Sequence, residues 1–180
     1  MKIIRVDMSK KSICVEELAP DYIGLGGRAL TAAVMNKEVP PKCDPLGQEN
    51  KLIFAPGLLS GTNFVNTSRI SVGTKSPLTG TIKESNGGGT IAAALGHLGI
   101  TAIIVEGKPS PGEMFILGID EKGEASLIKA DEYKGMRTYK LMEKLIDSFG
   151  NKISGMCIGP AGENLMKSES IQTYDVDDRP

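Results

Sequence analysis

Short apolar segments with the spacing of β-strands recur along this 180-residue chain, and few stretches have helical spacing. Residues 2–7 with 12–18, and 113–120 with 124–129, are joined by short polar turns and predict two β-hairpins. Further strands are predicted at 51–55, 69–74, 101–106, 153–158 and 167–173, and helices at 28–37, 90–98 and 131–149. Hairpins followed by interleaved strands and helices predict an α+β fold with mixed sheets.

Length and composition are typical of one globular domain, so residues 1–180 are treated as a single domain. Apolar residues make up 40% and charged residues 24%, which excludes wholesale disorder. The net charge of −1 offers no general attraction for nucleic acid or an anionic membrane. No apolar run is long enough to cross a bilayer, and residues 1–7 do not resemble a signal peptide. We therefore expect a cytoplasmic protein with neither partner.

The residue types that commonly carry catalysis or bind metals are sparse. Cys14, Cys43 and Cys157 lie far apart and form no Cys-x-x-Cys pair, so residues 1–180 alone cannot hold a four-cysteine iron–sulfur cluster. His97, the single histidine, has no carboxylate or cysteine nearby in the sequence and is interpreted as structural. We assign no catalytic residue, and the acidic tail at 175–178 is interpreted as a solvated end.

Glycine is the most unusual component of the composition, with 22 residues. Asn86-Gly87-Gly88-Gly89 precedes the predicted small-residue helix at 90–98. Backbone N–H groups at such a helix start favour anions, and the Asn86 carbonyl could ligate a cation. Arg69, at the start of a predicted strand, could clamp a phosphate. Arg69, Asn86, Gly87 and Gly88 are therefore candidate cofactor-binding residues, with Asn86 also a candidate metal ligand; a flexible loop and a surface arginine are the alternatives.

Two other motifs carry weaker signals. Gly24-Leu25-Gly26-Gly27-Arg28-Ala29 matches the G-x-G-x-x-A pattern of dinucleotide-binding folds. The segment before it is polar and contains Pro20, so a glycine turn entering a helix is favoured over that interpretation. The proline-centred stretch at 74–80 is interpreted as a structural turn, although Lys75 within it could contact a phosphate.

An internal similarity indicates a duplication within the chain. Residues 53–58 and 157–162 are each an apolar strand that ends in a turn containing glycine and proline. We expect a pseudo-duplicated domain in which the glycine turn at 87–89 has no second copy, with chance similarity as the alternative.

Several of these segments, taken in one order, resemble the N-terminal domain of the aldehyde ferredoxin oxidoreductase family of tungsten or molybdenum pterin enzymes. The matching stretches are 26–28, 43–53, 55–62, Arg69, 74–80, 85–88, 105–108 and 158–165. The resemblance covers essentially the whole chain. It implies an α+β duplication that forms the base for a bis-pyranopterin cofactor, tungstopterin or molybdopterin.

The resemblance also implies roles for individual residues. Arg69 matches a family arginine that contacts the pterin, and Gly88 matches a neighbouring backbone contact. Asn86 matches the asparagine whose carbonyl helps to hold a magnesium ion between the pterin phosphates. The family's second glycine motif, its 4Fe-4S cysteines and its acid–base residues have no counterpart in residues 1–180, so this chain alone is expected to be inactive.

The implied activity is oxidation of a small aldehyde to a carboxylic acid, or the reverse, with electrons passed to ferredoxin through the iron–sulfur cluster of later domains. The alternative functions are a non-catalytic module that binds phosphorylated ligands and a purely structural module. The sequence decides neither the substrate, nor the choice of tungsten or molybdenum, nor whether the chain forms a homodimer.

Overall fold

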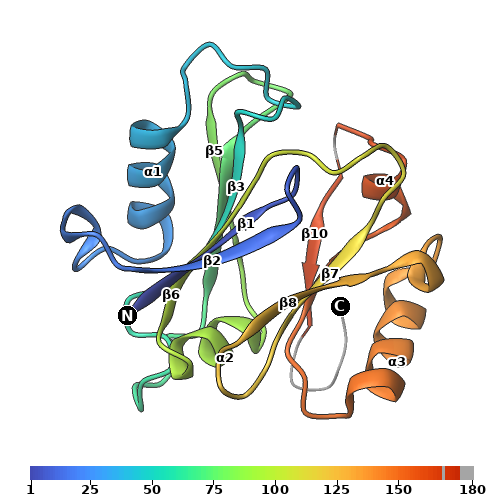
Figure 1. Ribbon diagram of the computed structural model, residues 1–180. Helices are drawn as coiled ribbons and strands as arrows, with labels where there is room; N and C mark the ends of the chain where they lie inside the picture. Colours follow the sequence, from blue (N-terminus) through green and yellow to red (C-terminus); the bar gives the residue numbers. More distant parts are fainter. Residues whose placement is uncertain (168, 175–180) are drawn as a thin grey trace.

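A six-stranded sheet forms the centre of the computed structural model, which describes residues 1–167 and 169–174; the acidic tail lies outside them. The strand order is β2-β1-β6-β3-β4-β5 (Figure 1). β1 and β6 pair in parallel, and the other neighbours are antiparallel, which confirms the expected α+β class with a mixed sheet. The strands are β1 Lys2–Asp7, β2 Ser12–Glu17, β3 Lys51–Pro56, β4 Ile70–Lys75, β5 Ile82–Gly87 and β6 Ile100–Glu106.

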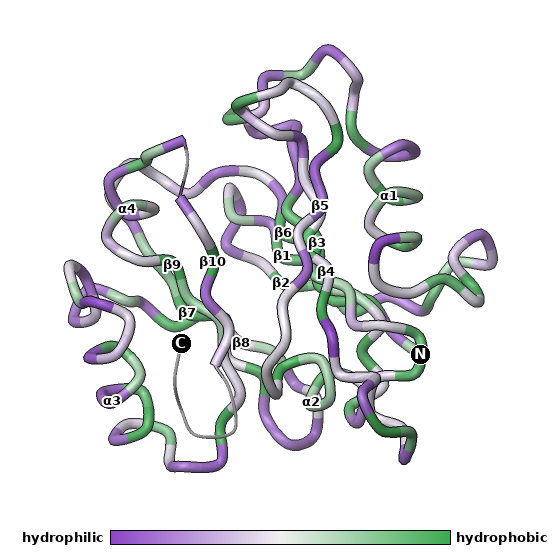
Figure 2. The backbone as a smooth tube through the Cα atoms, turned by 180° about the vertical axis from the view of Figure 1, so that it is seen from behind, coloured by the Kyte–Doolittle hydropathy of each residue, from purple (hydrophilic) through white to green (hydrophobic). Residues whose placement is uncertain are grey.

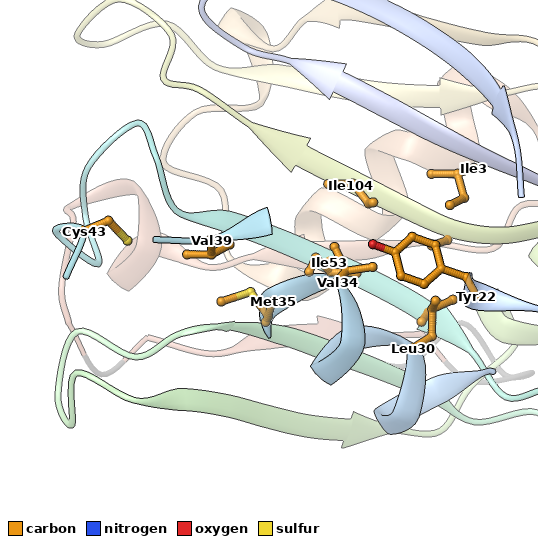
Figure 3. Packing of buried hydrophobic residues seen from close by; sticks show 11 residues of the cluster. Ile3, Tyr22, Leu30, Val34, Met35, Val39, Cys43, Ile53 and Ile104 are labelled. Carbon is orange, nitrogen blue, oxygen red and sulfur yellow. The ribbon is translucent and has the colours of Figure 1, made fainter. Parts of the chain in front are cut away.

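Helix α1, Gly27–Glu38, covers one face of the sheet. Leu30, Val34 and Met35, at positions i, i+4 and i+5, lie on one side of this helix and are buried against Ile53 and Ile104 of the central strands (Figure 3). Tyr22, in the 3-10 turn Pro20–Tyr22, completes this apolar cluster. The helix entry at Gly26 and Gly27 confirms a glycine turn rather than a dinucleotide-binding loop, because β2 ends well before it at Glu17.

The opposite face of the sheet carries a second apolar cluster. Helix α2, Ile91–His97, buries Ala92 and Leu95 there against Ile70 and Ile103. The hairpin of β7, Phe115–Ile119, and β8, Ala125–Lys129, packs against the same cluster. The hydropathy colouring shows hydrophobic residues along the central strands β3 and β6, whereas the edge strand β5 is mostly polar (Figure 2).

The second half of the chain repeats the order of elements in the first. Each half has a hairpin, a 3-10 turn with a buried tyrosine, a 12-residue helix, and a strand paired with an antiparallel neighbour. Tyr22 and Tyr133 correspond, and each is followed two residues later by a glycine with positive φ, Gly24 and Gly135. The elements of the second half are 3-10 turn Asp131–Tyr133, α3 Thr138–Phe149, β9 Met156–Ile158, α4 Pro160–Glu163 and β10 Ile171–Thr173. The similarity between residues 53–58 and 157–162 therefore belongs to a longer correspondence.

Three predicted elements differ from the structure. The helix expected at 131–149 is divided, because Gly135 adopts φ of 73° between the 3-10 turn and α3. The two last strands are shorter than expected, and the helix α4 was not anticipated. Strand β5 was also missed, since its polar sequence lacks the alternation of a half-buried strand.

Among the described residues, no helix is long and apolar enough to span a bilayer.

Two charged arrangements are structural. Arg5 binds Glu38 through two hydrogen bonds of 2.9 Å, and Lys51 and Tyr22 also contact that carboxylate. Burial raises the pKa of Glu38, but the hydrogen bonds and charge of Arg5, the Tyr22 hydroxyl and the Lys51 charge together outweigh it, so the net pKa lies below the ordinary value. Lys75 is buried, and its ammonium donates to the carbonyls of Pro41 and Cys43 at 2.7 and 2.6 Å. Lys75 thus anchors a loop.

Candidate functional site

A polar hollow of about 420 Å³ lies on the α1 side of the sheet, beside the start of that helix. It is formed by the first turn of α1, the β3–β4 connection and the adjoining strands β4 and β5. Its lining residues are Gly27, Arg28, Gly57, Asn66, Thr67, Arg69, Ser71, Glu84 and Asn86.

Strand register brings the polar side chains of the hollow together. Ser71 on β4 lies opposite Asn86 on β5, and Gly73 lies opposite Glu84. Because side chains alternate across a sheet, these positions share the face that α1 covers, while Ile70 points into the opposite apolar cluster. Residues that are distant in the sequence thus converge at one end of α1.

Arg69 and Asn86, two of the candidate residues, are in direct contact. The Arg69 guanidinium donates through Nε to the side-chain oxygen of Asn86 and through Nη2 to its backbone oxygen, the latter at 3.4 Å. The Asn86 amide nitrogen donates to the Ser71 hydroxyl at 3.2 Å. Arg69 and Asn86 are both exposed, so a ligand in the hollow can reach them.

The glycines after Asn86 lie elsewhere than the sequence indicated. Gly87 belongs to β5 and faces the other side of the sheet, where a Cβ atom would lie 3.3 Å from the side chain of Thr173. Gly88 has open space around it, and Gly89 packs against the backbone oxygen of Tyr174, which also accepts a hydrogen bond from the Thr90 N–H. Neither Gly87 nor Gly88 lines the hollow.

Other glycines bring bare backbone to the hollow. Gly26 caps α1 without a side-chain hydrogen bond, which leaves the helix N-terminus open to an anion. A Cβ at Gly26 would lie 2.5 Å from the backbone nitrogen of Leu58, so the helix start and the β3–β4 connection are in backbone contact. Gly27 has φ of 51° and lies beside Gly57 and Ser71. The helix-entry turn, interpreted from sequence as structural, is therefore part of the site.

Arg28 and Glu84 also line the hollow and were not candidates from sequence. Arg28 is in the first turn of α1, and its Nε donates to a Glu84 carboxylate oxygen at 3.1 Å. Glu84 belongs to the strand that the sequence did not reveal. The segment 85–88 did signal this region, but nothing local indicated which neighbouring side chain would turn toward α1.

The hollow combines groups that attract an anion with an acceptor that attracts a hydrogen-bond donor. Two guanidinium groups and an uncapped helix N-terminus favour an anion, and one carboxylate oxygen of Glu84 is buried without a hydrogen-bond partner in the described part of the chain. Glycine-lined walls permit close approach of a flat ligand. No group of three or more His, Cys, Asp or Glu side chains suited to a metal occurs among residues 1–167 and 169–174.

Comparisons with known proteins show what the chain as a whole is similar to. Residues 3–179 match the family model described as aldehyde ferredoxin oxidoreductase, N-terminal domain. The tungsten-containing aldehyde ferredoxin oxidoreductases of Thermococcus kodakarensis and Pyrococcus furiosus are 40% and 39% identical to this chain; each match covers 94% of it and 28% of the relative. The chain thus spans little more than a quarter of these relatives. A solved structure of the BamBC active-site complex of benzoyl coenzyme A reductase superposes with a TM-score of 0.88 at 31% identity, covering 96% of this chain and 26% of that one.

Proposed function

The chain belongs to the aldehyde ferredoxin oxidoreductase family, whose N-terminal domain it matches, and on this premise we propose that its hollow binds the phosphate-bearing part of a pterin cofactor. One observation carries the proposal. Arg69 and Asn86, 17 residues apart in sequence, meet on the sheet face beside the open N-terminus of α1. The tungsten in the relatives' names supports a tungstopterin, with molybdopterin as the alternative.

Arg69 and Asn86 in the hollow, and the two glycines that follow Asn86, each have a task in this proposal. The Arg69 guanidinium binds a phosphate or a ring carbonyl, since its planar donors match such groups. A carbonyl of Asn86 helps to hold a magnesium ion that neutralises the phosphates. Gly88, with open space around it, remains available for a backbone contact, and Gly87 sets the end of β5.

The chemistry itself belongs to the bound group and to the rest of the enzyme. When bound, a tungsten or molybdenum pterin supplies the two-electron redox centre for converting an aldehyde and a carboxylic acid into one another. We assign the chain's own residues to holding and orienting that group, and none to catalysis. The proposal includes a 4Fe-4S cluster in the remaining part of the enzyme, ferredoxin as electron acceptor and a cytoplasmic location.

The test uses the complete enzyme that carries this domain. Arg69→Ala and Asn86→Ala are each expected to lower the tungsten or molybdenum content and the pterin content of the purified protein by about tenfold, since each removes hydrogen bonds or ligands from a charged group. Lys83→Ala is the matched control, because Lys83 is an exposed cation of the same strand β5 outside the hollow. Wild-type metal and pterin content in both site variants would overturn the proposal.

A further inference from the structure

Glu84 carries an unsatisfied acceptor in the floor of the hollow. Its side chain is 15% exposed, and one oxygen, Oε2, accepts the hydrogen bond from Arg28. The other oxygen, Oε1, is fully buried and has no hydrogen-bond partner in the part of the chain that the structure describes. Such a buried acceptor is costly, and in a native protein it calls for a partner such as a ligand group, an ion or a water molecule.

The fold itself places this carboxylate in the hollow. Glu84 shares the α1-facing side of β5 with Asn86, because the two residues are separated by one strand repeat. Its partner across the sheet is Gly73, where a Cβ would lie 2.5 Å from the Thr31 side chain of α1. Because α1 packs closely on β4 at Gly73, no side chain of β4 fills the space opposite Glu84. Glu84 therefore lies beside the start of α1, where it lines the hollow with Gly27 and Arg28.

Arg28 satisfies only part of this carboxylate. Its side chain is 78% exposed, and it donates to one oxygen alone. An exposed ion pair contributes little to stability, so the pair does not by itself account for a buried carboxylate with a free oxygen. Arg28 holds the carboxylate through Oε2, and this leaves Oε1 without a donor among the described residues.

We propose that Glu84 is a ligand-binding residue whose Oε1 accepts a hydrogen bond from an N–H group of the bound heterocycle. This inference rests on the proposed function and names the part of the ligand that the carboxylate recognises. Arg69 and the start of α1 favour an anion, whereas the Glu84 carboxylate repels an anion and can only accept hydrogen bonds from donor groups. The hollow therefore selects a molecule that carries both phosphate and ring N–H groups, and it fixes the direction in which that molecule lies.

The test compares Glu84→Gln and Glu84→Ala with Glu49→Gln in the complete enzyme. Glu49 is an exposed glutamate without an ion pair in the described residues and provides the matched control. The measurements are the rate at which purified enzyme loses pterin during dialysis and the melting temperature of the pterin-free protein. Glu84→Ala is expected to lose pterin about tenfold faster, because the hydrogen bond to a charged acceptor is removed, and Glu84→Gln is expected to lose it faster by a smaller factor, because its amide oxygen still accepts but carries no charge.

The pterin-free melting temperature distinguishes binding from a merely structural role. Removing an unsatisfied buried acceptor leaves that temperature unchanged or raises it, whereas a structural carboxylate would lower it. Pterin loss at the wild-type rate in both Glu84 variants, or faster loss accompanied by a lower pterin-free melting temperature in both, contradicts the inference. The two proposals can fail separately. If the wild-type enzyme holds pterin and Arg69→Ala releases it, a negative result for the Glu84 variants leaves the proposed function standing. If the purified wild-type enzyme contains no pterin, the proposed function itself is overturned.

Discussion

Replacing Gly96 by alanine should destabilise the protein, although the same change usually stabilises a helix. Gly96 lies within α2, where alanine is ordinarily favoured over glycine by about 1 kcal/mol. A Cβ at this position would lie 2.1 Å from the backbone oxygen of Ser60, more than 1 Å closer than an ordinary van der Waals contact. A Cβ at Gly61, whose φ is 80°, would likewise lie 2.5 Å from the backbone of Gly96 and His97.

The magnitude follows from these two opposing effects. Overpacking costs about 1–3 kcal/mol, and the backbone crossing at Ser60 places Gly96→Ala toward the upper end. After the helix gain of about 1 kcal/mol, a net loss of about 2 kcal/mol remains. For a chain of this size, that loss lowers the melting temperature by about 4–8 °C.

Thermal unfolding followed by circular dichroism measures this change. Gly88→Ala is the matched control: a Cβ there meets nothing within 4 Å, so its free energy of unfolding should change by less than about 0.5 kcal/mol. The β3–β4 connection that Gly96→Ala displaces also contributes Gly57 and Thr67 to the hollow, so pterin retention should fall as well. An unchanged or higher melting temperature for Gly96→Ala would refute the proposed backbone crossing.

Three further results are expected. Because the pKa of Glu38 is lowered in the folded protein, its stabilising contribution is complete above the ordinary value of 4.5 and is lost as the pH falls through the lowered value. In urea unfolding, the free energy of unfolding should therefore fall less on acidification in Glu38→Gln than in the wild type. An equal fall in both proteins would argue against this role. Lys75→Met removes two buried hydrogen bonds from a charged donor and should lower the free energy of unfolding by about 2 kcal/mol or more; a stability equal to wild type would contradict the anchoring role. Exposed Cys14 should react with iodoacetamide well before Cys157, whose thiol pKa is raised by burial, and peptide mass mapping that finds Cys157 labelled first would disagree with the structure.

Local sequence patterns determined much of the fold. The hairpin at 2–17, the helix α1 and the strand β6 follow from alternation, helical spacing and apolar runs that each element carries within itself. Turns at glycine and proline marked where these elements end. Strand β5 was invisible by the same logic, because Ile82–Gly87 is polar and becomes a strand only through its pairing with β4.

The sequence by itself made Arg69 and the Asn86 segment candidates for a binding site, because guanidinium donors and glycine backbone N–H groups both favour anions. Only the tertiary structure decided which face each residue occupies. The register of β4 and β5 turns Arg69 and Asn86 toward α1 and turns Gly87 toward β10. The same register brings Glu84 under the helix start, since strand pairing and helix packing join residues across distances that no local pattern records.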